Sequence, residues 1–95
     1  DAIPLLTQYL KAQPDALAAH ADLGRAYLHL EQYANAATEL RKAAAADDQG
    51  EIHYQLSTAL RKLGRIREAD AALKESVDIR RARAARDQRR YEVHR

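Results

Sequence analysis

Residues 20–43, HADLGRAYLHLEQYANAATELRKA, are followed 33 residues later by a similar stretch, HYQLSTALRKLGRIREADAALKES, at residues 53–76. The matching positions hold apolar or small residues at helical spacing, while the positions between them vary freely. The main pairs are Leu23 and Leu56, Ala26 and Ala59, Leu30 and Leu63, Ala36 and Ala69, and Leu40 and Leu73. A repeat that keeps only its apolar stripe is typical of stacked structural units.

Each unit carries two apolar stripes, and each stripe has the spacing of an amphipathic helix. The stripes of the first unit are His20, Leu23, Tyr27 and Leu30, then Tyr33, Ala36, Leu40 and Ala43. We expect turns at Glu31–Gln32 and at Gly64–Arg65, where glycine accepts a left-handed backbone. Asp47, Asp48 and Gln49 precede the next helix, and an aspartate there is suited to cap its free N–H groups.

These residues resemble the tetratricopeptide repeat, whose pattern is W-x2-L-G-x2-Y, then A-x3-F, then P. The first unit reads His20-x2-Leu23-Gly24-x2-Tyr27, then Ala36-x3-Leu40, with Asp48 in place of proline. The second reads His53-x2-Leu56-Ser57-x2-Leu60, then Ala69-x3-Leu73, with Arg81 in place of proline. Small residues such as Gly24 and Ala36 would let the two helices of a unit approach closely.

The resemblance implies an all-α fold, a right-handed superhelical solenoid of antiparallel helix pairs with five helices, the last one long. We expect residues 1–14 to hold the second helix of a truncated preceding repeat, because Ala2-x3-Leu6 and Pro14 fit the back half of the pattern. Two repeats then follow at 15–48 and 49–80, and residues 81–95 form a basic extension of the last helix.

The composition agrees with a helical fold and excludes several classes of function. Phe, Trp, Met and Cys are absent. Without cysteine there is no disulfide framework and no thiol nucleophile, and the compartment stays open between cytoplasm and periplasm. No apolar run approaches about 18 residues, so we expect a soluble chain without a membrane span.

No constellation of residues predicts catalysis, a metal site or a cofactor. His20 and His53 lie a whole repeat apart, which favours packed, hydrogen-bonded histidines over a metal pair. His53 and Ser57 are one helical turn apart, yet no third orienting group or oxyanion donor accompanies them. Asp47, Asp48 and Glu51 lack the ligand count that calcium requires. We therefore expect no enzyme, no metal and no cofactor.

The first helix of each unit would line the concave side of the superhelix, where such proteins bind peptides. Counting around these helices away from the apolar stripe predicts the lining of a peptide-binding groove, in which Ala18, Ala21 and Glu51 accompany the main members. Its predicted members are Arg25, Leu28, His29, Tyr54, Thr58, Arg61 and Lys62. Three full positive charges beside Tyr54 and Leu28 favour a protein or peptide partner of acidic and partly apolar character. The sequence therefore predicts a non-catalytic protein–protein interaction scaffold.

Charge is divided unevenly: residues 1–79 carry a net charge of −3 and residues 80–95 a net charge of +5. No Gly or Pro follows Arg65, so we expect one long helix over about 66–90 that ends in a basic arm. The arginines of this arm are Arg80, Arg81, Arg83, Arg86, Arg89 and Arg90. The arm is interpreted as a solvated capping helix, a coiled-coil seam or, as the alternative function, a module that binds nucleic acid or an anionic surface.

The first helix, at about residues 2–12, lacks the partner helix that would complete its unit. Leu5 and Leu6 would lose part of their cover. Two complete units are also close to the minimum of about three repeats that a stable array needs. We therefore predict self-association through this open N-terminal helix face.

Overall fold

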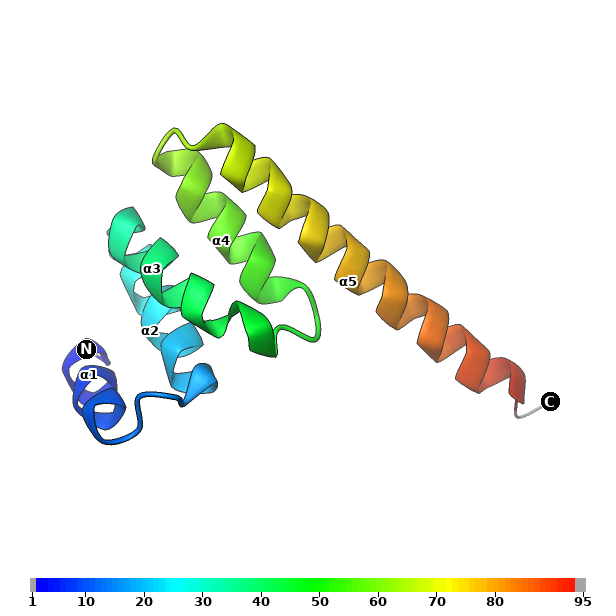
Figure 1. Cartoon of the computed structure of the whole chain (residues 1–95), viewed down its shortest axis with the longest axis horizontal. Coiled ribbons are helices and arrows are strands. Elements are labelled where there is room, and N and C mark those ends of the chain that lie inside the picture. The colour runs from blue at the N-terminus through cyan, green and yellow to red at the C-terminus, as the bar shows by residue number, and fades with distance from the viewer. Residues whose placement is uncertain (1, 94–95) are drawn as a thin grey trace.

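The computed structural model describes the backbone of residues 2–93 and the side chains of residues 2–90. Its helices pack in chain order, each against the next, and no strand occurs within residues 2–93 (Figure 1). The all-α fold predicted from the repeat is confirmed. The helices are α1 (Ile3–Ala12), α2 (Leu17–His29), α3 (Tyr33–Ala43), the short 3-10 helix η1 (Ala44–Ala46), α4 (Glu51–Lys62) and α5 (Ile66–Val93).

The two turns predicted inside the units have the same backbone geometry. Gly64 has φ of 79°, and Glu31, one repeat earlier, adopts the same left-handed region with φ of 59°. Gln32 N–H donates to the Tyr27 carbonyl at 2.9 Å, and Arg65 N–H donates to the Leu60 carbonyl at 2.9 Å. These bonds close the helix ends because they satisfy carbonyls that have no partner within the helix. The two units therefore share the hydrogen bonds of their turns as well as their apolar positions.

Close packing between α2 and α3 depends on a glycine. A Cβ atom added to Gly24 would lie 2.7 Å from Cγ of Leu40, whose side chain is fully buried. The absence of that atom allows the two helices to interdigitate at interior density. Small residues elsewhere in the seam act in the same way, since Ala36, Ala59 and Ala69 are all fully buried. The predicted role of small residues at these positions is confirmed.

The core is divided between two groups of buried side chains that follow the stack. The larger group lies between α3, α4 and α5, and the smaller lies between α1 and α2. Tyr27 is packed against both groups and connects them. The larger group consists of Ala36, Ala37, Leu40, Leu56, Ala59, Leu60, Ala69 and Ala72, and the smaller of Leu10, Ala19 and Leu23.

The register of α5 against α4 is fixed at the beginning of α4. Gly50 precedes this helix with φ of 82°, and the Ser76 hydroxyl donates to the Gly50 carbonyl at 2.7 Å. A Cβ atom on Gly50 would meet the backbone oxygen of Ser76 at 2.7 Å. Since Ser76 is itself buried, this contact aligns the middle of α5 with the first turn of α4.

The sequence predicts an aspartate cap on α4 and leaves Asp47 and Asp48 as candidates; the structure shows that Asp47 forms it. Its Oδ1 accepts a hydrogen bond from Gly50 N–H at 2.8 Å, and its Oδ2 accepts one from His53 N–H at 2.9 Å. Burial of the carboxyl group raises the pKa of Asp47, but hydrogen bonds from His53, Gly50 and Gln49 outweigh this effect. The pKa of Asp47 therefore lies below its ordinary value of 3.8.

We expect Asp47→Ala to lower the free energy of unfolding by about 1–2 kcal/mol at pH 7, as for other lost helix caps. A carboxyl group whose pKa is depressed by folding stabilises the protein fully above its unfolded pKa, and this stabilisation is lost as the pH falls through the folded pKa. The difference in the free energy of unfolding between wild type and variant should therefore become smaller in acid. Urea unfolding at pH 7 and below pH 3.8 measures it. A difference that stays constant over this range would contradict the assignment.

The last helix continues well past the packed body. α5 runs for 28 residues, and the sequence prediction of a long helix over about 66–90 is confirmed. Residues 80–90 are all exposed, and Figure 1 shows these turns projecting beyond the loop that precedes α4. Within residues 2–93 no helix combines the length and apolar character needed to cross a bilayer.

Candidate functional site

A hollow of about 280 Å³ lies between α4 and α5, and we call it the α4–α5 hollow. Four of its lining residues come from the groove predicted from the sequence. Their spacing along α4 places them on one face of the helix. The hollow is lined by Tyr54, Ser57, Thr58, Arg61 and Lys62 of α4 and by Leu73 of α5.

An aromatic ring and three cations dominate this hollow and its rim. Tyr54 is 49% exposed, and Cζ of Arg80 lies 5.7 Å from the centroid of its ring. Arg61 donates to Oδ1 of Asp70 at 2.9 Å. Lys62 is exposed and makes no ion pair or hydrogen bond with any residue that the structure describes. An exposed tyrosine and, about two helical turns further along α4, a free ammonium group suit a ligand with both apolar and acidic parts.

The three residues predicted on α2 do not line this hollow. Leu28 is partly buried against the larger core group, and His29 is exposed at the last residue of α2. Arg25 is half-buried, with Nη1 3.4 Å from Oδ1 of Asp22. Ala21 is only 3% exposed, so the expectation that it lies beside the groove at the surface is wrong. The helical count from the sequence therefore identifies the residues of α4 that line the hollow. It also groups them with residues of α2 that do not line it.

Two residues at the hollow were missed by the sequence analysis. Leu73 lines it from α5, and Arg80 covers Tyr54 from 26 positions further along the chain. No local spacing relates these residues to Tyr54. Their position follows from the register of α5 on α4, which depends on the contact between Ser76 and Gly50.

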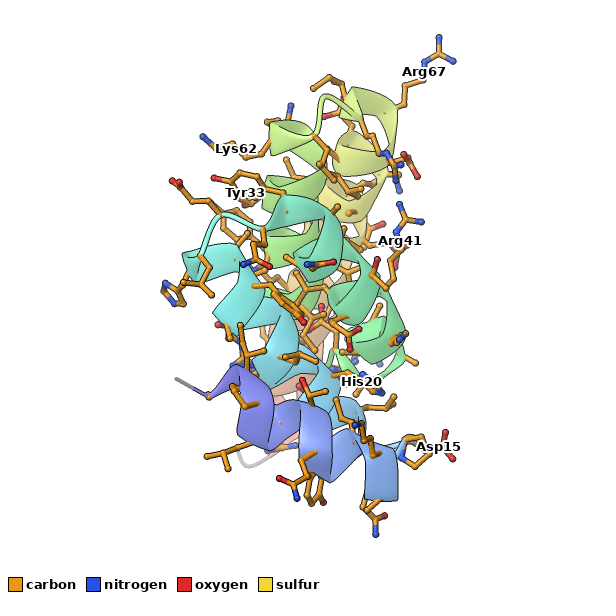
Figure 2. The ribbon with its side chains drawn as sticks, turned by 90° about the vertical axis from the view of Figure 1, so that its left-hand side faces the viewer. Asp15, His20, Tyr33, Arg41, Lys62 and Arg67 are labelled. Atoms are coloured by element: carbon orange, nitrogen blue, oxygen red, sulfur yellow. The ribbon has the colours of Figure 1, made fainter. Side chains whose placement is uncertain are left out.

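Two further hollows lie on the other side of the stack, but their polar groups are mostly satisfied. The first, of about 360 Å³, is lined by residues that include His20, Glu39 and Lys42. His20 Nδ1 lies 2.7 Å from Oε1 of Glu39, and Lys42 Nζ lies 3.3 Å from its Oε2. The second, of about 280 Å³, is spanned by the ion pair of Arg41 and Glu68 at 2.7 Å. Figure 2 shows Lys62 on the opposite side of the molecule from His20, Arg41 and Arg67.

The comparison with known families decides the identity of the fold. Two family models described as tetratricopeptide repeat match residues 1–54 and residues 50–83. The chain belongs to the tetratricopeptide repeat family. Neither the curated proteins nor the solved structures that were searched gave a match. Tetratricopeptide repeats generally mediate protein–protein interactions and are typically non-catalytic scaffolds, so protein partners follow from the family.

His20, His53 and both serines of this tetratricopeptide repeat chain are engaged in structural hydrogen bonds. His20 Nε2 lies 2.8 Å from the Pro14 carbonyl, and His53 Nδ1 lies 2.7 Å from Oδ2 of Asp47. Ser57 donates to the Tyr54 carbonyl at 2.7 Å and not to His53. Within the described part of the chain, no group of three His, Cys, Asp or Glu residues is placed to hold a metal ion.

The N-terminal face of the stack carries exposed apolar side chains. Leu5 is 72% exposed and Tyr9 is 54% exposed, whereas Leu10 on the same helix is buried. Leu6 is partly buried and packs against the smaller core group. Self-association through this face stays a prediction.

Proposed function

We propose that this tetratricopeptide repeat chain binds a segment of a partner protein on its concave helix face, at the α4–α5 hollow. The observation that carries the proposal is the half-exposed ring of Tyr54, with Arg80 over it, in a hollow that Lys62 also lines. Tyrosine and arginine are among the side chains that contribute most to protein interfaces. Leu73 adds apolar surface to the same hollow.

The chemistry of the hollow indicates an acidic and partly apolar segment as its ligand. Arg61, Lys62 and Arg80 supply positive charge, and only Arg61 is paired with a carboxylate among the described residues. A carboxylate of the partner could form an ion pair with Lys62, and an apolar side chain of the partner would contact Tyr54. In the two other hollows most of the charged side chains pair with one another, with Lys11 and Glu75 unpaired among the described residues, and neither hollow is lined by an exposed aromatic ring.

The proposal is tested by selecting peptides from a phage-displayed library on the full chain, then measuring affinities by fluorescence anisotropy. We expect the selected peptides to contain Asp or Glu next to apolar residues. Lys62→Glu should weaken their binding by about tenfold, since it replaces an attraction with a repulsion. Tyr54→Ala should weaken peptide binding by about tenfold or more, as is usual for an aromatic side chain that becomes buried in an interface.

Arg67→Glu is the matched control for this experiment. It makes the same change of net charge at an exposed position, and Figure 2 places Arg67 on the opposite side of the molecule from Lys62. We expect its effect on affinity to stay within about twofold. If both charge reversals weaken binding equally, or if neither Lys62→Glu nor Tyr54→Ala has an effect, the proposed site is wrong.

A further inference from the structure

One face of α5 changes its chemistry along the helix. The face can be followed in steps of three and four residues. Ala69, Ala72 and Ser76 are 0%, 7% and 1% exposed, and Ile79 is half-buried. The next three positions in the same series are Arg83, Arg86 and Arg90, and all three are exposed. We call these last three residues the arginine stripe.

The helix geometry keeps the arginine stripe on the side by which α5 packs against the stack. An α-helix turns by about 100° per residue, so the whole series from Ala69 to Arg90 stays within about 100° around the axis, and the three arginines within about 60°. The rise of about 1.5 Å per residue separates Arg83 from Arg90 by about 10 Å. The face is thus continuous, and only its residue types change.

The change occurs where the cover from α4 ends. Gly50, just before α4, contacts Ser76 and would approach the Arg80 side chain to 3.2 Å if it carried a Cβ atom. Beyond this point no other helix lies beside α5 in Figure 1. Arg83, Arg86 and Arg90 make no ion pair or hydrogen bond with any described residue. The packing face of α5 therefore continues as three unpaired cations.

We propose that the arginine stripe docks an acidic α-helix of a partner protein, lying along α5 beyond the beginning of α4. Carboxylates at i, i+3 and i+7 on the partner helix would repeat about every 5 Å, as the three arginines do. Each guanidinium can accept a carboxylate with two parallel hydrogen bonds. This surface is distinct from the α4–α5 hollow, and its use goes beyond the function proposed above.

The alternatives fit this face less well. A second copy pairing by the same stripe would place arginine against arginine, which charge repulsion opposes. A nucleic acid would contact arginines all around the helix, including Arg81 and Arg89, and would not require three arginines on one face. The regular spacing on one face favours a helical partner.

The test uses the full chain and two synthetic helical peptides of the same composition. In one, three glutamates stand at i, i+3 and i+7; in the other they are spread around the helix. We expect the first peptide to bind about tenfold more tightly in fluorescence anisotropy at low salt, because only it presents all its carboxylates to the stripe. Arg83→Glu with Arg86→Glu should weaken this binding by about tenfold or more.

The matched control is the pair Arg81→Glu with Arg89→Glu, which changes the net charge equally but lies off the stripe. We expect this control to weaken binding of the peptide with glutamates at i, i+3 and i+7 by no more than about threefold. Lys62→Glu should leave the affinity for this peptide unchanged, which distinguishes the arginine stripe from the α4–α5 hollow. Equal binding of the two peptides, equal losses in the two double variants, or preferential binding of a single-stranded RNA oligonucleotide would overturn the proposal.

Discussion

Gly50→Ala should lower the free energy of unfolding by about 2–4 kcal/mol, whereas Gly64→Ala should lower it by only about 1 kcal/mol. Both glycines have a left-handed backbone, with φ of 82° and 79°. A Cβ atom at Gly50 would also meet the Ser76 backbone oxygen at 2.7 Å, whereas nothing lies within 4 Å at Gly64. The comparison therefore separates backbone strain, which both variants share, from the clash that only Gly50→Ala introduces.

Urea unfolding followed by circular dichroism measures both variants under one set of conditions. The larger loss at Gly50 would show that the contact of Ser76 with Gly50 sets the register of α5. That register places Leu73 and Arg80 at the α4–α5 hollow, so Gly50→Ala should also weaken peptide binding there. Equal losses of stability in the two variants would contradict this role for the contact.

Leu40→Ala should destabilise the chain by about 2–5 kcal/mol, the range for truncating a fully buried leucine. Leu40 is 0% exposed and belongs to the core group between α3, α4 and α5. Its side chain also fills the space that Gly24 leaves open on α2. The loss should appear in urea unfolding as a lower midpoint with an unchanged slope.

The pair of Gly24 and Leu40 allows a sharper test by a double-mutant cycle. Gly24→Ala alone should cost about 1–3 kcal/mol, because its Cβ would lie 2.7 Å from Cγ and 2.8 Å from Cδ2 of Leu40. Leu40→Ala removes both of these atoms, so Gly24→Ala should cost much less in that background. If the two costs simply add, the side chains are not in the contact described.

The sequence predicts the helices well because both the core and the turns follow the repeat. Gly24 and Ala36 were expected to allow close approach between helices, and the packing of Leu40 and the full burial of Ala36 show that they do. Asp47 or Asp48 was expected to cap the next helix, and the carboxylate of Asp47 accepts two backbone hydrogen bonds there. These features depend on residues that are near in sequence or related by the repeat.

The candidate site is less predictable because it depends on how helices align across the stack. The equivalent positions Ala21 and Tyr54 were both expected near the groove surface, yet Ala21 is buried and Tyr54 is half-exposed. No periodicity relates Tyr54 to Arg80, since their contact depends on the alignment of α5 with α4. The arginine stripe likewise becomes evident only when the burial of the first half of α5 is known.

The proposed capture of a partner segment at the α4–α5 hollow can be followed residue by residue in solution. The most direct test titrates the ¹⁵N-labelled chain with a peptide selected from the library and follows amide chemical shifts by NMR. We expect saturable shifts centred on Tyr54, Thr58, Lys62 and Leu73, with little change around Arg41 and Glu68. Saturable shifts centred on Arg41 and Glu68, with those at Tyr54 and Lys62 unmoved, would contradict the proposed capture.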